Sequence, residues 1–326
     1  MQLRRRRLIT RGITLLAAPG LVVAQTPGKV WRIGVLSAAS GPDQNLRAFV
    51  EGLRALGYVE GRNLSIEFRG AAGKVERLPE LAMELVLLKV DVILAATGPT
   101  TIAAKRATSS IPVVMVTAPD PVAMGLVASL GRPGGNVTGT TNMSTDLAGK
   151  SLQLLREWFP KTTRIGVLVW KGAPATPLYL ELLRSAAQVT GVTLTVQQEN
   201  QPEALAGAFA AMQQERAQAL MVQVSPFTFE HRRQIVELAA QHRLPAVFAA
   251  REFVDAGGLM SHGPNQLDLM RRASYFVDRI FKGDKPADLP VEQPTTFEIV
   301  LNQKTAKALG VTIPQSLLLR ADEVLQ

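Results

Sequence analysis

The chain has 326 residues, of which 47% are apolar and 19% charged, and its 36 basic and 27 acidic residues give a net charge of +9. This is the composition of a globular protein with a large core, and the length favours two lobes over a single domain. Cysteine is absent from the sequence, which excludes disulfides, thiolate metal sites, a cysteine nucleophile and a lipidated cysteine.

The first residues have the features of a secretion signal. Arg4–Arg7 form a positive block, residues 13–23 form a short apolar stretch, and Val22–Ala24 resembles a cleavage site. We expect residues 1–24 to be a cleaved signal peptide of a periplasmic protein, and its arginine pair resembles a twin-arginine signal. The alternative is a retained signal anchor, although the apolar stretch is too short to cross a bilayer comfortably.

The charge that remains after cleavage is small. Five of the basic residues and no acidic residue lie in residues 1–24, so the rest of the chain carries +4. These charges are scattered, and no basic run is interleaved with aromatic residues. We therefore expect no nucleic-acid partner. After residue 28 no apolar run is long enough for a membrane helix.

The two halves of the chain repeat one pattern. The sequence of Arg32–Leu36 recurs letter for letter as Arg164–Leu168. Behind each copy come amphipathic helices and further short apolar strands in the same order. The strands expected in the first half are 32–36, 64–68, 90–94 and 111–114, and those in the second half are 164–168, 192–196, 219–222 and 244–247.

These strands are continuous apolar runs, which is typical of parallel strands that are buried on both faces. Right-handed crossovers then place helices on both sides of each sheet. The fold class predicted is α/β, with two doubly wound parallel-sheet lobes joined by a hinge of several chain crossings. Ligands in such sheets bind beyond the carboxyl ends of the strands, so two facing lobes form one cleft.

Three segments carry a resemblance to a known family. Residues Gly52–Asn63, Asp120–Gly139 and Lys282–Glu292 resemble, in this order, motifs of the ABC-transporter substrate-binding proteins of the tryptophan/tyrosine type. The likeness extends over essentially the whole mature chain. It implies a periplasmic-binding-protein fold of type I, an extracytoplasmic location and hinge closure on a small ligand.

The repeat and the resemblance together predict the domain layout. We expect lobe 1 to comprise residues 28–143 and 264–290, and lobe 2 to comprise residues 144–263. The lobe that holds the C-terminal strand and helices, residues 291–326, is left open. Crossings between the lobes are expected at residues 142–146, 263–268 and 290–301.

Candidate ligand contacts lie where strands end. They are Ser37, Ser40, Thr97, Thr100, Thr117, Asn142, Trp170, Gln223, Phe227, Arg251 and His262. Hydroxyl groups and free backbone N–H groups before a helix suit a carboxylate or another anion. The alternative for Ser40, together with Asp43, is a helix cap, and Asp120 before Pro121 is more typical of a cap than of a ligand contact.

Aromatic and charged candidates come from the second half. Trp170 and Phe227 are expected to line the cleft, where an aromatic ring offers area and an attractive face for a cation. Core packing is the alternative for both. Arg251 and Glu252 could hold a carboxylate and an ammonium group, or they could form a solvated first helical turn.

Signs of catalysis are weak. The chain has three histidines, and His231 and His242 are eleven residues apart on one expected helix, without a carboxylate at metal-ligand spacing. No nucleophile elbow or phosphate loop is present. We therefore expect neither an enzyme nor a metal or cofactor.

The function expected is that of the binding component of an ABC importer, which acts as a monomer. Its expected partners are a small polar or aromatic ligand and a membrane permease. The alternative is a sensory module that presents its ligand to a membrane receptor. A transcription regulator is excluded because the secretion signal occupies the place of a DNA-binding segment.

Overall fold

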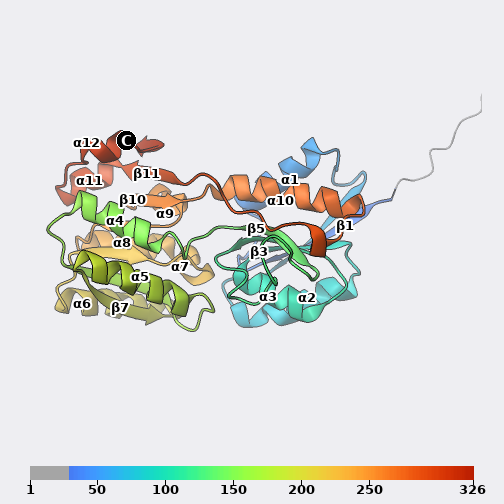
Figure 1. Ribbon diagram of the computed structural model, residues 1–326, viewed down its shortest axis with the longest axis horizontal. Helices are drawn as coiled ribbons and strands as arrows, with labels where there is room; N and C mark the ends of the chain where they lie inside the picture. Colours follow the sequence, from blue (N-terminus) through green and yellow to red (C-terminus); the bar gives the residue numbers. More distant parts are fainter. Residues whose placement is uncertain (1–28) are drawn as a thin grey trace, which may run out of the picture.

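The computed structural model describes residues 29–326, so the expected signal peptide, residues 1–24, lies outside the described residues. Figure 1 shows two α/β lobes side by side, with the C-terminus in the lobe that holds α4 to α9. Each lobe has its own sheet, and no strand within residues 29–326 belongs to both sheets. The two-lobed α/β fold predicted from the repeat is confirmed.

The sheet of the first lobe has five parallel strands in the order β2-β1-β3-β4-β5. These strands are β1 Trp31–Ser37, β2 Leu64–Gly70, β3 Val92–Thr97, β4 Val113–Ala118 and β5 Val137–Thr141. Helices α1 Gln44–Ala55 and α10 Gln266–Phe281 pack on one face of the sheet. On the other face lie α2 Leu78–Leu87 and α3 Gly98–Ala107. Two short 3₁₀ turns, η1 Val75–Arg77 and η3 Pro286–Asp288, complete the lobe.

The sheet of the second lobe has seven strands in the order β12-β11-β10-β9-β8-β6-β7. They are β6 Arg164–Trp170, β7 Thr193–Glu199, β8 Ala219–Val222, β9 Ala246–Phe248, β10 Met260–Gly263, β11 Glu298–Asn302 and β12 Glu323–Leu325. One face is covered by α4 Ala148–Trp158, α5 Thr176–Thr190, α11 Gln303–Leu309 and α12 Gln315–Leu318. The other face is covered by α6 Leu205–Gln214, α7 Pro226–Glu230, α8 Arg232–Gln241 and α9 Arg251–Asp255, and η2 Pro202–Ala204 precedes α6.

The repeated glycine of the two halves has a packing role. Gly34 and Gly166 lie in β1 and β6, which occupy equivalent positions in their sheets. A Cβ atom on Gly34 would lie 2.9 Å from Leu85 of α2, and one on Gly166 would lie 2.6 Å from Met212 of α6. The missing side chain lets the second helix of each half pack closely on the sheet.

The described chain passes between the lobes three times, at residues 142–147, 264–265 and 293–297. The first crossing leads from β5 into α4, the second from β10 into α10, and the third from the bridge between Thr140 and Glu292 into β11. Residues 298–326 extend the second sheet, so the C-terminal strand and helices belong to the second lobe.

One strand pair differs from the expected all-parallel sheets, because β10 and β11 run antiparallel. The route of the chain explains this. After β10 the chain leaves the second sheet at the carboxyl edge, forms α10 in the first lobe, and returns to the same edge. A strand that enters a sheet where its neighbour leaves must run in the opposite direction.

Candidate functional site

A cavity of about 150 Å³ lies between the lobes, at the carboxyl edges of the two sheets. The first lobe contributes residues at and after the ends of β1, β3 and β4, and the second lobe contributes the ends of β6 and β8. This is the edge at which ligands bind in open α/β sheets. Two residues of α10, Gln266 and Met270, line the same cavity.

Six residues predicted from strand exits are brought together here. They are Ser37, Thr97, Thr117 and Asn142 from the first lobe and its crossing, and Trp170 and Gln223 from the second lobe. The parallel sheets explain the gathering, because all strands of a parallel sheet end at the same edge. Their contact with a solute remains a prediction.

Two predicted hydroxyl residues do not line the cavity. Ser40 is exposed, and the cap of α1 is Asp43, whose carboxylate accepts a hydrogen bond from the Leu46 N–H. Thr100 is fully buried, and its hydroxyl accepts from the Thr97 N–H at 2.8 Å and donates to the Thr97 carbonyl at 2.7 Å. The Thr100 hydroxyl therefore belongs to the start of α3, where capping competes with ligand contact, and Ser40 lies in the loop before α1.

The structure places Phe227 in the core of the second lobe, with its ring 5.0 Å from that of His231. The ring that lines the cavity is Phe229, two residues later. The reason is local structure: residues 226–230 form helix α7, and residues two apart on a helix point about 200° apart around its axis.

Arg251 and His262 also lie away from the cavity. The Arg251 guanidinium forms ion pairs with Glu323 of β12, at 2.6 Å, and with Asp255. His262 is buried in β10, with its Nδ1 3.2 Å from the Ser151 hydroxyl. Burial is the main cause that lowers the pKa of His262 to about 4. These two side chains therefore join elements within the second lobe.

The cavity walls are largely apolar and aromatic. Phe68 and Met124 of the first lobe and Met270 of α10 line one side, and Trp170 and Phe229 of the second lobe line the other. Such a surface binds an apolar or aromatic group by excluding water from both partners. Sequence reasoning missed Phe68, Met124, Met270 and Phe229, because no local pattern shows that their side chains meet at one cavity.

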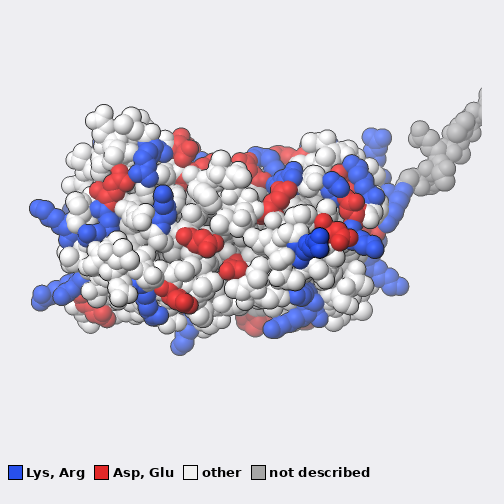
Figure 2. Space-filling view, in the orientation of Figure 1, with Lys and Arg blue, Asp and Glu red and all other residues white. Residues whose placement is uncertain are grey.

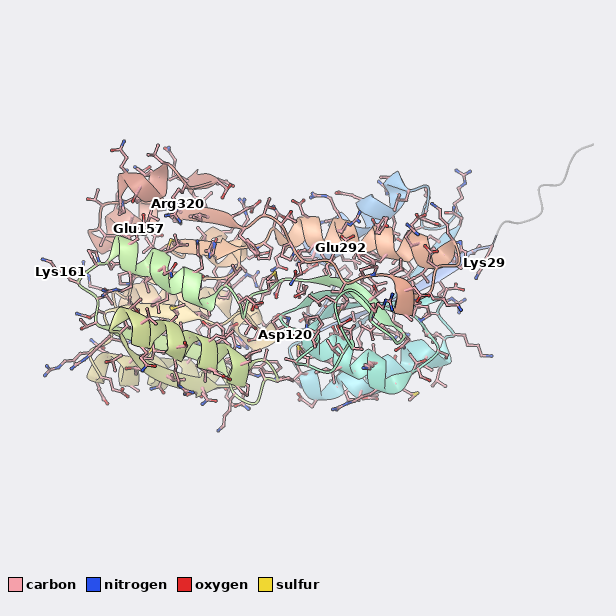
Figure 3. All side chains as sticks on the ribbon, viewed as in Figure 1. Lys29, Asp120, Glu157, Lys161, Glu292 and Arg320 are labelled. Carbon is pink, nitrogen blue, oxygen red and sulfur yellow. The ribbon has the colours of Figure 1, made fainter. Side chains whose placement is uncertain are left out.

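The charged side chains among the lining residues are both acidic. Asp43 caps α1, and Glu230 is exposed at the end of α7. Acidic side chains also lie near the junction of the lobes in Figure 2, and Figure 3 labels Asp120 there. Burial and the neighbouring Asp120 carboxylate raise the pKa of Asp146, which lies in the first crossing. The acidic side chains thus place negative charge around the cavity, which favours a cationic group.

Three helices of eight or more residues begin at the cavity. They are α1 after Asp43, α3 after Thr97, and α5, which follows the lining residues 173–175. The first turn of a helix has free backbone N–H groups and a positive dipole end, which suits an anionic group. Within residues 29–326 no group of three or more His, Asp or Glu side chains could hold a metal ion.

The comparison with protein families decides the family. Residues 32–325 match the model of a family described as ABC transporter substrate binding protein. The chain belongs to this family. ABC transporter substrate-binding proteins are extracytoplasmic binding proteins, and in residues 29–326 no helix is long and apolar enough to cross a membrane.

Relatives of this substrate-binding protein bind aromatic amino acids. A tyrosine-binding protein of Clostridioides difficile is 27% identical to this chain over 289 residues. The match covers 86% of this chain and 81% of the relative. This chain is also similar to a domain from Streptococcus pneumonia that was solved in complex with L-Trp. The TM-score is 0.84 and the identity 28%, and the match covers 90% of this chain and 99% of the other.

A further solved relative is described as ligand-free and open. It is a substrate-binding protein with adhesive properties from Clostridium difficile. Its comparison with this substrate-binding protein gives a TM-score of 0.67 and 26% identity, and covers 91% of this chain and 100% of the other. Solved transport proteins of lower identity share the type I periplasmic-binding-protein fold.

Proposed function

We propose that this substrate-binding protein binds a free amino acid with an aromatic or large apolar side chain in the cavity between its lobes. The observation that carries the proposal is the composition of the cavity, which combines aromatic walls with two carboxylates and the starts of three helices. Each part of such an amino acid finds complementary chemistry there.

The side chain of the solute fits the apolar wall. Trp170 and Phe229 lie on the second lobe, and Phe68 lies on the first. Rings on both sides can stack on, or meet edge to face with, an aromatic solute, which is worth roughly 0.5–1.5 kcal/mol per pair beyond burial.

The ammonium group fits the acidic side of the cavity. Of the two lining carboxylates, Asp43 already caps α1 and accepts from Asn45 as well. Glu230 forms no hydrogen bond or ion pair within residues 29–326 and is the better partner for a cation. The Asp43 carboxylate already occupies the start of α1, so the starts of α3 and α5 supply the positive potential for the carboxylate of the solute.

The arrangement of the lobes and the relatives support this reading. The chain is about equally identical to the L-Trp complex and to the open, ligand-free protein, yet the TM-scores are 0.84 and 0.67. We infer that the lobes are arranged as in the tryptophan complex. The tyrosine-binding relative points to the same class of solute.

The transport part of the proposal follows from the family and the sequence. The mature protein, after loss of residues 1–24, resides in the periplasm and delivers its amino acid as a monomer to the permease of an ABC importer. Intact-mass measurement of the exported protein tests the processing, and a mature chain that still begins at Met1 would contradict it.

A thermal-shift panel tests the solute class. The panel contains L-tryptophan, L-tyrosine, L-leucine, L-lysine, glucose and indole-3-propionate. At a concentration 100-fold above its dissociation constant, a true solute adds about 2.7 kcal/mol of stability. We expect the aromatic amino acids to raise the melting temperature most. A shift with glucose or with indole-3-propionate alone would overturn the proposed class.

A charge-removing variant tests the ammonium contact. We expect Glu230→Gln to weaken the binding of the amino acid by a few-fold, because one solvent-screened ion pair is lost. The binding of indole-3-propionate, which lacks the ammonium group, should not weaken. Glu237→Gln is the matched control, since Glu237 is exposed on α8 away from the cavity. Equal calorimetric affinities of the two variants would assign the ammonium group to another partner.

A further inference from the structure

Gln223 and Thr176 form a hydrogen-bonded unit at the wall of the cavity. We propose that Thr176 is a positioning residue that holds the Gln223 amide so that its N–H groups face the cavity and donate to the carboxylate of the bound amino acid. This inference rests on the proposed function. Thr176 does not line the cavity, so its role is exerted through Gln223.

The carbonyl end of the Gln223 side chain is occupied by the protein. Its Oε1 lies 2.9 Å from the Thr176 hydroxyl and 3.4 Å from the backbone nitrogen of Trp170. The Thr176 hydroxyl also lies 3.0 Å from the Trp170 carbonyl oxygen. Gln223 and Thr176 are 6% and 4% exposed, so water competes little for these groups.

The Trp170 backbone determines the orientation of the amide. A backbone N–H can only donate, so an acceptor must face it. Turning the Gln223 amide by 180° would set the Nε2 hydrogens against the Trp170 N–H. The Thr176 hydroxyl has one hydrogen, which it donates to Oε1 at 2.9 Å rather than to the Trp170 carbonyl, because that carbonyl also accepts from the Ala173 N–H.

The Nε2 group is then the end that remains for a solute. It forms no hydrogen bond with the protein within residues 29–326, and Gln223 lines the cavity. Among the described residues Nε2 does not belong to the buried polar atoms without a partner, so it is open to the cavity, where the carboxylate of a solute can accept from it in place of water. The cavity has no lining Lys or Arg among the described residues, so a carboxylate there depends on neutral donors of this kind.

Asn142 is arranged in a similar way at the first crossing. It is 5% exposed and lines the cavity, and its Oδ1 accepts from the Ser144 N–H at 3.2 Å. Its Nδ2 has no protein partner within residues 29–326. Both amides therefore have their oxygens bound by the protein and their donors available, which fits an anionic group of the solute.

The first test compares two substitutions of Thr176 by calorimetry with L-tryptophan and tryptamine, which lacks the carboxylate. Thr176→Val removes the hydroxyl at nearly constant volume. We expect it to weaken L-tryptophan binding roughly 10-fold, within the range for a hydrogen bond to a charged group, and to leave tryptamine binding unchanged. Thr176→Ser should restore the wild-type preference. Equal losses for both compounds would show a merely structural role and overturn the proposal.

The second test reverses the chemistry of the donor. Gln223→Glu keeps an oxygen for Thr176 but presents a carboxylate oxygen to the solute. We expect L-tryptophan binding to fall by roughly 100-fold or more, with tryptamine binding maintained or improved. Gln218→Glu is the matched control, because the Gln218 side chain accepts from Thr163 outside the cavity. A Gln223→Glu protein that binds L-tryptophan as tightly as the control would contradict the proposal.

A solute-free measurement separates this inference from the proposed function. If the wild-type protein binds none of the amino acids in the panel, the proposed solute class fails. The side-chain amide resonances of Gln223, observed by NMR without solute, then report on the hydrogen bond from Thr176. We expect them to shift in Thr176→Val and to return in Thr176→Ser. Unchanged resonances in Thr176→Val would show that Thr176 does not position the amide.

Discussion

His262 shows how a single buried side chain can couple the hinge region to pH. It lies at the carboxyl end of the second sheet, near the start of β11, and its ring is 6.2 Å from that of Phe297 in the third crossing. Its partner Ser151 lies in the first turns of α4, just after the first crossing. Burial, and then the positive charges of Lys150 and Arg320, lowers the pKa of His262 to about 4.

This pKa predicts a loss of stability in mild acid. Between pH 6.5 and about 4 the unfolded chain binds a proton at His262 and the folded chain does not. Stability therefore falls as the pH drops through this window, by a total of the order of 3 kcal/mol, and is unaffected above it. Urea unfolding at pH 7.5 and 4.5 should show a smaller pH effect in His262→Asn than in the wild type. The same substitution at His231 is the control, and identical pH effects in all three proteins would refute the prediction.

At the scale of elements, the segments that carry the family resemblance connect elements of the first lobe. The Tyr58 hydroxyl donates to Asp278 of α10 at 3.0 Å, and Lys282 forms an ion pair with the same carboxylate. Burial, followed by the hydrogen bond and charge of Asp278, raises the pKa of Tyr58 to about 12. Asn63 closes the loop by accepting from the Val59 N–H and donating to the Gly57 carbonyl.

The other two segments, Asp120–Gly139 and Lys282–Glu292, also connect elements of the first lobe. The Asn136 amide donates to the carbonyls of Thr108 and Ile111, at 2.9 Å each, and thereby joins β5 to the start of β4. Glu292, labelled in Figure 3, forms a bidentate pair with Arg272 of α10. The three segments thus contain mainly packing and turn residues of the first lobe, and Met124 is the residue within them that lines the cavity among the described residues.

The hydrogen bond between Tyr58 and Asp278 of α10 predicts that its loss lowers the stability of the protein and leaves solute binding unchanged. Tyr58→Phe removes one hydrogen bond to the buried Asp278, which should cost about 1.5–3 kcal/mol. The affinity for the amino acid should stay the same, because neither residue lines the cavity. Tyr275→Phe, which alters a more exposed contact with Arg279, is the control and should cost less. A Tyr58→Phe protein of normal stability but weaker binding would contradict this assignment.

At the scale of the whole molecule, Val75 joins the two lobes. It belongs to η1 of the first lobe and packs against the apolar cores of both lobes. With Trp170 and Pro99 it also lines a second cavity of about 370 Å³ between α2, α3 and the second lobe. This contact forms only when the lobes are together, so it adds to the stability of that arrangement independently of the solute.

The contact predicts that Val75→Ser shifts the lobes apart. Loss of a partly buried valine side chain removes about 1 kcal/mol of apolar burial, which weakens apparent solute affinity by roughly fivefold through a smaller binding-competent population. Small-angle scattering without solute should show a larger radius of gyration. Val189→Ser, at an 87% exposed position on α5, is the control. A Val75→Ser protein with unchanged radius and affinity would show that this contact does not govern the arrangement.

The two sheets, and the residues at the strand ends that line the cavity, could be predicted from the sequence. Continuous apolar runs and the repeated Arg32–Leu36 pattern predict buried parallel strands, and these strands end together at one edge. That geometry brings Thr97 and Thr117 to the edge of the first sheet and Trp170 and Gln223 to the edge of the second. The crossings between the lobes then place the two edges at one cavity.

Which neighbouring side chains line the cavity depends on the tertiary structure. Phe229 lines the cavity and Phe227 does not, because a short helix forms at residues 226–230. Met270 enters the site because α10, far away in sequence, packs beside α1. The orientation of the Gln223 amide depends on Thr176 and Trp170, which are about 50 residues away in sequence and meet it only through the pairing of β6 with β8. Side-chain direction and hydrogen-bond partners depend on such long-range contacts, which local sequence patterns do not contain.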